Sequence, residues 1–193
     1  MLRYEGRYER LFGIKTMQIK KSDDEQNFHY QGASYLVLLD LFKKLPEYLK
    51  NKNFVDIGSG KGRALFCAEY SGFNSLIGVE LDRELVDIAN ENIGKYLLKR
   101  KESHFKFVCE NALHFVIPEN TGVFYFFNPF SENIMKEVEK NISARQIHNG
   151  SEIFIIYVNP QFKNVWENAG YETYYKEGNS RYTEALIFRK KGS

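Results

Sequence analysis

Few features of secreted, membrane-spanning or metal-binding proteins occur in this sequence. Its two cysteines, Cys67 and Cys109, are too few for a disulfide framework, and we expect both to be buried free thiols. No apolar stretch reaches the roughly 18 residues that a membrane-spanning helix needs, and no N-terminal run resembles a signal peptide. The four histidines are scattered, and none pairs with another histidine or a cysteine at metal-ligand spacing. We therefore expect a cytoplasmic protein without a metal site.

An excess of charge of one sign is also absent. The chain has 27 lysines and arginines against 25 aspartates and glutamates, a net charge of +2. This balance gives no overall attraction to nucleic acid or to acidic membranes, so we expect a small-molecule or protein substrate. The 193 residues, 43% of them hydrophobic, suffice for one domain with a sizeable core. Nothing in the sequence specifies an oligomeric state.

The most informative stretch runs from Phe54 to Glu80. A short apolar run, FVDI, precedes the alternate glycines of GSGKG, and a helical pattern and a second apolar run ending in Glu80 follow. Strand, glycine turn, helix, strand and acid is the order of a parallel βαβ unit that binds an adenosine-containing ligand. Asp56 lies beside the turn, where it can hold an amino group or brace the loop. Glu80 lies where an acid can accept hydrogen bonds from both ribose hydroxyls.

The spacing of the glycines separates two classes of cofactor. A dinucleotide site has a small residue three positions after the second glycine, and here that position is the bulky, charged Arg63. The third glycine, Gly62, comes one position earlier. No GxxxxGK[ST] sequence is present, so a phosphate-binding P-loop is excluded. The spacing therefore argues against NAD as well as against a P-loop nucleotide.

The remaining pattern predicts one α/β domain over residues 34–193. Expected helices, each with an apolar stripe, lie near 35–45, near 83–101 with Leu97 buried, after Ser131 and after Pro160. Expected strands, mostly short apolar runs, lie near 54–57, 76–79, 105–109, 123–127 and 153–158, with a final hairpin from 171–176 and 184–189. Alternation of strands and helices predicts a doubly wound, mostly parallel sheet with a C-terminal antiparallel hairpin.

Residues 1–33 are expected to form an irregular leader that is both basic and aromatic. We interpret it as an arm that packs its apolar side on the domain; the alternative is a flap over the active site or a substrate-docking surface. A nucleic-acid-binding arm is disfavoured because the cations do not form a block. The segment 29–34 precedes a helix and is a candidate wall of the cofactor pocket, with a plain connector as the alternative.

Over about residues 34–190 the chain resembles the class I S-adenosylmethionine (SAM) methyltransferases. The run DIGSGKG is similar to motif I of that family, (D/E)xGxGxG. The resemblance implies a seven-stranded sheet whose last strand inserts antiparallel, with SAM as the cofactor. It assigns cofactor binding to motif I and to the end of the second strand, namely to Asp56, Gly58, Ser59, Gly60, Gly62, Glu80 and Leu81.

Two further short motifs extend the resemblance. Asn111 and Ala112 follow the third strand, where the family commonly has an acid and an alanine; an amide oxygen can still accept from the adenine amino group. The run Asn128-Pro129-Phe130 resembles a shortened (N/D)PP(Y/F) motif of amino-methylating members. It makes Asn128 and Phe130 candidates for positioning the methyl acceptor, and Asn128 also a candidate cofactor contact.

A segment before the first domain helix resembles part of the non-SET histone-lysine methyltransferase fold. In that fold a tyrosine-glycine-serine segment lies against the methionine moiety of SAM. Tyr30, Gly32 and Ser34 are the corresponding residues here, and Tyr30 and Ser34 are therefore candidate cofactor contacts.

The sequence thus predicts a SAM-dependent methyltransferase that acts on a nitrogen or oxygen nucleophile. Methyl transfer from a sulfonium mainly requires alignment of the two reactants, so the lack of a catalytic triad does not argue against it. Two alternatives stay open: a non-catalytic module that binds SAM or a nucleotide, and a nicotinamide-linked oxidoreductase of the same fold.

Overall fold

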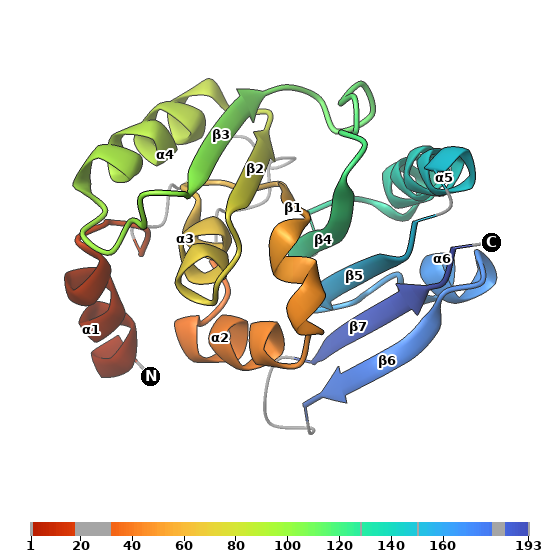
Figure 1. Cartoon of the computed structure of the whole chain (residues 1–193), viewed down its shortest axis with the longest axis horizontal. Helices are drawn as coiled ribbons and strands as arrows, with labels where there is room; N and C mark the ends of the chain where they lie inside the picture. Colours follow the sequence, from red (N-terminus) through yellow and green to blue (C-terminus); the bar gives the residue numbers. More distant parts are fainter. Residues whose placement is uncertain (1, 18–31, 128, 150, 179–183, 193) are drawn as a thin grey trace.

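A seven-stranded sheet with the order β3-β2-β1-β4-β5-β7-β6 forms the centre of the molecule in the computed structural model (Figure 1). The structure describes residues 2–17, 32–127, 129–149, 151–178 and 184–192. The parallel strands are β1 (Asn53–Ile57), β2 (Ser75–Glu80), β3 (His104–Cys109), β4 (Thr121–Phe127) and β5 (Ile153–Val158). The hairpin strands β6 (Glu172–Glu177) and β7 (Ala185–Lys190) complete the sheet, and β7 inserts antiparallel between β5 and β6.

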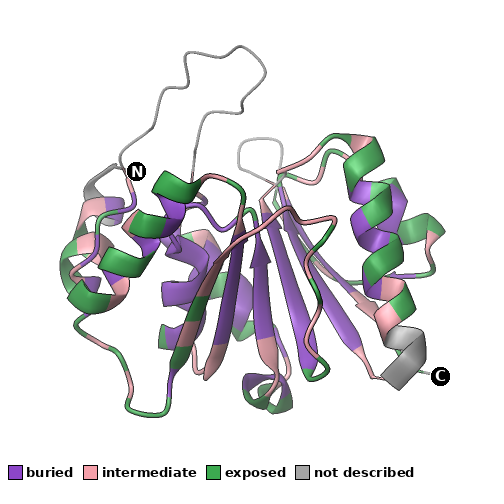
Figure 2. Ribbon diagram, turned by 90° about the horizontal axis from the view of Figure 1, so that it is seen from above, coloured by how far each residue is buried: buried purple, intermediate pink, exposed green. Residues whose placement is uncertain are grey.

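Helices cover both faces of this sheet. They are α1 (Leu2–Phe12), α2 (Tyr35–Lys43), α3 (Arg63–Tyr70), α4 (Arg83–Lys95), α5 (Glu132–Asn149) and α6 (Lys163–Asn168), with a 3₁₀ turn η1 (Glu47–Asn51). One core gathers side chains of α1, α2 and α3 on one face, and a second core gathers α5 and α6 on the other. Figure 2 shows the central strands buried while the outer sides of the helices are exposed. This confirms the predicted doubly wound fold with its C-terminal hairpin.

The sequences of β4 and β5 are apolar without alternation because each strand is covered on both of its faces. Tyr125 and Ile156 belong to the first core, whereas Phe124 and Ile155 belong to the second. A strand that is covered on both faces needs apolar side chains at every position.

No helix among the described residues combines the length and the apolar character needed to cross a membrane.

The expectation of an irregular leader is wrong for Leu2–Phe12, which form helix α1. Glu5, Tyr8 and Phe12 lie on one side of this helix, because residues three or four apart share a helix face. Phe12 is fully buried, and the Tyr8 ring stacks on Tyr35 of α2 with 5.4 Å between ring centroids. The many charges of this stretch hid an amphipathic helix that packs on the domain.

Helix α4 is shorter than the sequence predicted, because it ends at Lys95 rather than near Lys101. The backbone N–H of Leu97 donates to the carbonyl oxygen of Phe12 at 2.9 Å, so the chain leaves the helix to bind the N-terminal segment. Leu97 is 71% exposed and does not belong to the buried stripe. The prediction for the cysteines is correct for Cys67, which is buried, but wrong for Cys109, which is only partly buried.

Candidate functional site

A cavity of about 960 Å³ opens at the carboxyl ends of β1, β2 and β4. This volume lies in the range of small-molecule sites, and the edge is the one where open α/β sheets bind ligands. The walls come from the segment before α2, the glycine loop, the ends of β2 and β3, and the connections after β4 and β5. Residues that the sequence singled out and that line it are Asp56, Gly58, Ser59, Glu80, Leu81, Asn111, Ala112 and Phe130.

The glycine loop between β1 and α3 has a backbone that requires glycine. Gly58 and Gly62 have φ angles of 83° and 85°, in the left-handed region. A Cβ atom on Gly62 would lie 2.5 Å from Cζ of Phe107, and one on Gly58 would lie 2.8 Å from Cβ of Pro129. Gly60 and Gly62 do not line the cavity. Their contribution is therefore to the shape of the loop.

Glu80 at the end of β2 fixes the loop from the other side. Its Oε2 accepts from the N–H of Gly60 at 2.9 Å, and its Oε1 accepts from the N–H of Asp82 at 2.9 Å. A carboxylate has about four lone-pair sites, so both oxygens can accept further bonds. The side chain thus holds the loop and still has acceptor capacity toward the cavity that it lines.

Asp56 is a buried acid with an oxygen that has no hydrogen-bond partner among the described residues. It is 2% exposed, and among the described residues its Oδ1 accepts no hydrogen bond. Burial, and secondly the charge of Glu80, raises the pKa of this carboxyl well above its ordinary value. The Oγ of Ser59 is likewise buried and without a partner among the described residues. An uncompensated acid at a cavity wall is typical of a ligand-binding position.

The structure places the remaining predicted residues differently. The Ser34 hydroxyl donates to Oε1 of Glu5 at 2.7 Å, and Ser34 does not line the cavity, whereas Gly32 and Ala33 do. Segment 32–34 is thus a cavity wall in part, as one reading of the sequence proposed. Tyr30 and Asn128 lie outside the described residues.

Asn111 already uses its amide oxygen within the chain. Its Oδ1 accepts from the N–H of Leu113 at 2.9 Å. The same oxygen has a second lone pair, which can accept a hydrogen bond from a ligand amino group at this wall of the cavity. Glu110 lines the cavity next to it, and its Oε1 accepts from the N–H of Asn111 at 3.1 Å.

Sequence reasoning missed several residues of the cavity wall. Arg63, read from the sequence only as a bulky side chain, is 6% exposed and lines the cavity. Asn159 and Gln161 line it from the connection after β5. Asn159 is the non-glycine residue with a positive φ, 53°, among those described. The Asn-Pro pair that ends the strand was visible in the sequence and, like the Asn-Pro pair after β4, was a usable signal.

Metal ligands do not gather anywhere in the described part of the chain, where no group of three or more His, Cys, Asp or Glu side chains could hold an ion. The chemistry of the cavity must be argued from its carboxylates, its amides and Arg63.

Several solved structures with the same architecture are methyltransferases by name. A putative RNA methyltransferase from Pyrococcus horikoshii is 17% identical with a TM-score of 0.63, covering 100% of this chain and 99% of that one. Magnesium protoporphyrin IX methyltransferase from Synechocystis PCC 6803, solved with bound SAM, is 11% identical with a TM-score of 0.59, covering 82% and 79%. TrmK from M. capricolum, in complex with S-adenosylhomocysteine, is 18% identical with a TM-score of 0.58, covering 79% and 67%.

These likenesses establish the fold, which is that of the class I SAM-dependent methyltransferases. No protein-family model matches the chain, and no curated protein is similar to it in sequence. Identities between 11% and 18% carry no information on the reaction, so the function rests on the residues of the cavity.

Proposed function

We propose that this chain is an enzyme, a SAM-dependent methyltransferase that acts on a nitrogen or oxygen nucleophile of a small molecule or a protein side chain. The observation that carries the proposal is the charge of the cavity beside the glycine loop. Four acidic residues line it, Asp56, Glu80, Asp82 and Glu110, against one basic residue, Arg63, among the described lining residues. SAM carries a sulfonium and an ammonium and suits such a cavity, whereas the pyrophosphate of NAD would be repelled.

The residues present fit SAM at each of its parts. Glu80 lies at the end of β2 and keeps acceptor capacity for the ribose hydroxyls. Asp56, whose Oδ1 has no partner in the described chain, is the candidate acceptor for the ammonium group. Asn111 and Ala112 line the wall assigned to adenine. The contacts of Tyr30, Ser34 and Asn128 with the cofactor stay predictions from the sequence.

The role of the protein in the reaction is to place the acceptor. SAM supplies a methyl group bound to an electron-poor sulfur. The chain must hold a nucleophile in line with that bond and exclude water, and alignment of this kind supplies much of the rate. Phe130 lines the cavity beside Pro129 and can pack against the acceptor. Asn128 is the proposed polar contact, and Asn159 and Gln161 add amides on the neighbouring connection.

Titration calorimetry separates the cofactor classes. S-adenosylhomocysteine, the product form of the cofactor, should release or take up heat on binding, and NAD should not. Heat with NAD alone would overturn the proposal in favour of a nicotinamide-linked oxidoreductase. As a control, the Glu91→Ala variant, which lacks an exposed acid of α4 away from the cavity, should bind S-adenosylhomocysteine as the wild type does.

Transfer of labelled methyl from SAM into a cell extract then separates an enzyme from a binding module. We expect incorporation that depends on the protein and is lost in a Gly62→Val variant that no longer binds the cofactor. Binding of S-adenosylhomocysteine without any incorporation would favour the non-catalytic module.

A further inference from the structure

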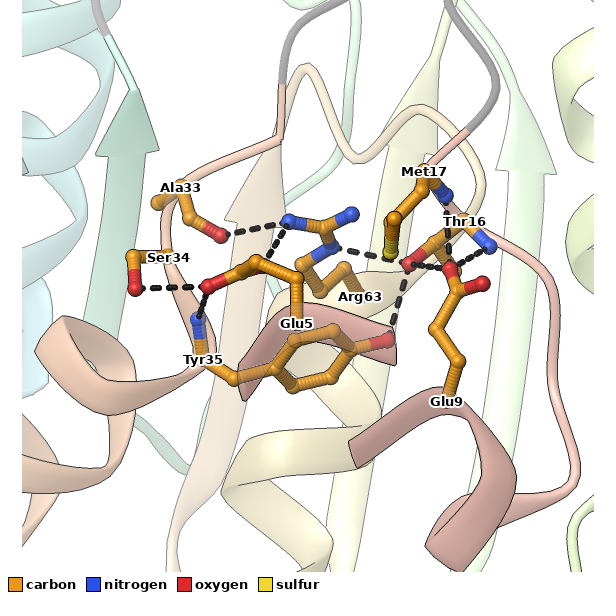
Figure 3. A network of polar contacts seen from close by, with 8 residues as sticks. All are labelled: Glu5, Glu9, Thr16, Met17, Ala33, Ser34, Tyr35 and Arg63. Atoms are coloured by element: carbon orange, nitrogen blue, oxygen red, sulfur yellow. Dashed lines mark hydrogen bonds and ion pairs between the residues drawn. The ribbon is translucent and has the colours of Figure 1, made fainter. Parts of the chain in front are cut away.

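Arg63 stands at the centre of a buried polar network that joins the N-terminal segment to the cavity. It is the first residue of α3, directly after the glycine loop. Its Nη1 donates to Oε2 of Glu5 at 3.0 Å and to the carbonyl oxygen of Ala33 at 2.9 Å, and its Nε donates to Oγ1 of Thr16 at 2.8 Å (Figure 3). The guanidinium therefore has two of its three nitrogens fixed by acceptors from three different segments.

The flat faces of the guanidinium are packed as well. Its Cζ lies 4.6 Å from the centroid of the Tyr35 ring, a cation–π distance. A Cβ atom on Gly32 would lie 2.9 Å from the same Cζ, so the backbone of Gly32 also packs closely against the group. Neighbours on these sides restrict the guanidinium to one orientation.

The third nitrogen of Arg63, Nη2, carries further N–H donors. Among the described residues none accepts a hydrogen bond from it, and Figure 3 shows it without a dashed line. Arg63 lines the cavity and is only 6% exposed. A guanidinium edge with unused N–H groups at a cavity wall can bind an acceptor of a ligand, and carboxylate is the acceptor that best matches its geometry.

Glu5 holds this arrangement in place from helix α1. Glu5 is 7% exposed. Its Oε2 accepts from Arg63, while its Oε1 accepts from the Ser34 hydroxyl at 2.7 Å and from the N–H of Tyr35 at 3.2 Å. The ion pair with Arg63 balances one buried charge with another. Glu5 is thereby a positioning residue, because it does not line the cavity itself and acts on it through Arg63 and through Ser34 and Tyr35.

Thr16 is fixed in its turn by Glu9 of α1. The Thr16 Oγ1 donates to Oε1 of Glu9 at 2.9 Å, and its own N–H and that of Met17 bond to the same oxygen. Farther along, the Asn92 side chain bridges the backbone of Lys15 and the carbonyl oxygen of Lys61 in the glycine loop. The N-terminal segment is thus bound to the loop by two independent sets of hydrogen bonds.

We propose that Arg63 binds the carboxylate of the cofactor's amino-acid portion, and that helix α1, through Glu5, is an integral part of the cofactor site. The inference rests on the proposed function. Arg63 is the basic residue among the described residues that line an otherwise acidic cavity. Asp56 lies before the glycine loop and Arg63 after it, so an acid and a base flank the loop as the two ends of a zwitterionic amino acid require.

The test compares three ligands that differ at the amino-acid end. S-adenosylhomocysteine carries the carboxylate, its decarboxylated analogue lacks only that group, and 5′-methylthioadenosine lacks the whole amino-acid end. Calorimetry on Arg63→Gln should show a roughly 10- to 100-fold loss of affinity for S-adenosylhomocysteine, since a charge-assisted hydrogen bond is lost. The affinities for the decarboxylated analogue and for 5′-methylthioadenosine should stay within about threefold of the wild type.

Two further variants keep the test sharp. Arg63→Gln leaves Glu5 buried and unpaired, so the double variant Glu5→Gln/Arg63→Gln restores neutrality and should show the same ligand selectivity with a more stable fold. The matched control is Arg100→Gln, which removes another arginine from a buried carboxylate, Glu69, away from the cavity. It should lower stability and leave the affinities for all three ligands unchanged.

The outcomes separate this inference from the proposed function. Equal losses for all three ligands in the Arg63 variants would make Arg63 a purely structural residue and overturn the inference. Unchanged affinity for S-adenosylhomocysteine would place the carboxylate elsewhere. A wild-type protein that binds none of the three adenosine ligands would overturn the proposed function itself.

Discussion

The two ends of the cavity are built differently. At the glycine-loop end, two charged groups are fixed by several partners: Glu80 accepts from two backbone N–H groups, and Arg63 donates to three acceptors. At the end of β4 and β5, Ile134 is 37% exposed and Asn159 lies at the surface. Variants at the first end should therefore change stability and cofactor affinity together, whereas variants at the second should change only methyl transfer.

The largest effect is expected for Gly62→Ala, at the rigid end. The substitution forces a left-handed φ on alanine, at about 1–2 kcal/mol, and drives its Cβ into the Phe107 ring, at about 1–3 kcal/mol. We expect the free energy of unfolding, measured by urea titration, to fall by roughly 2–5 kcal/mol, and binding of S-adenosylhomocysteine to be lost.

Gly170→Ala is the matched control for that variant. Gly170 has nearly the same φ, 84°, but a Cβ there would have no neighbour within 4 Å. It should cost only the backbone strain, about 1–2 kcal/mol, and leave binding unchanged. Equal losses of stability in the two variants would show that the contact with Phe107 is relieved at little cost.

Glu80→Ala should come next. It removes the acceptor proposed for the ribose and releases the N–H groups of Gly60 and Asp82. We expect calorimetry to show S-adenosylhomocysteine and 5′-methylthioadenosine both weakened by about 2 kcal/mol, roughly 30-fold, because both carry the ribose. A loss confined to S-adenosylhomocysteine would contradict the ribose assignment and place Glu80 at the amino-acid end.

The glycine-loop end was also the more predictable one. Its key residues lie within the 27 positions from Phe54 to Glu80, so spacing alone related them to one another. The alternation of strands and helices predicted a doubly wound, mostly parallel sheet, which the structure has. Local patterns of this kind are visible in one sequence.

Contacts between distant segments explain what the sequence did not reveal. Glu5 and Arg63 are 58 positions apart, and neither position shows a pattern that pairs them. Helix α4 ends early because Leu97 binds the carbonyl of Phe12, a residue of the N-terminal segment. Asn159 enters the cavity only because β5 lies beside β4 in the sheet.

Asp56→Asn tests whether the buried acid serves binding at the cost of stability. A raised pKa in the folded state means that the folded protein loses stability as pH rises from the ordinary aspartate range through the raised value. Asp56→Asn cannot lose that proton, so its unfolding free energy should not fall over this pH range, and near neutral pH the variant should be the more stable protein.

Affinity should change in the opposite direction in the same variant. The ammonium of the cofactor favours the ionised carboxyl, so binding to the wild type should release a proton below the raised pKa. Calorimetry in buffers of different ionisation enthalpy measures that proton. We expect Asp56→Asn to release none and to bind about tenfold more weakly. Identical proton release by both proteins would mean that Asp56 does not meet the ammonium.

The smallest effect on fold and cofactor is expected for Asn159→Gly, at the end formed by β4 and β5. Glycine accepts the φ of 53° without strain, so the variant deletes the amide while keeping the backbone, and stability should change by less than about 1 kcal/mol. Affinity for S-adenosylhomocysteine should stay at the wild-type value, while incorporation of labelled methyl into the extract should fall. Asn159→Asp, which also tolerates this φ, shows whether the amide N–H or only the shape of the side chain matters. If cofactor affinity falls together with transfer in Asn159→Gly, then Asn159 belongs to the cofactor end, and the two ends of the cavity are not separable.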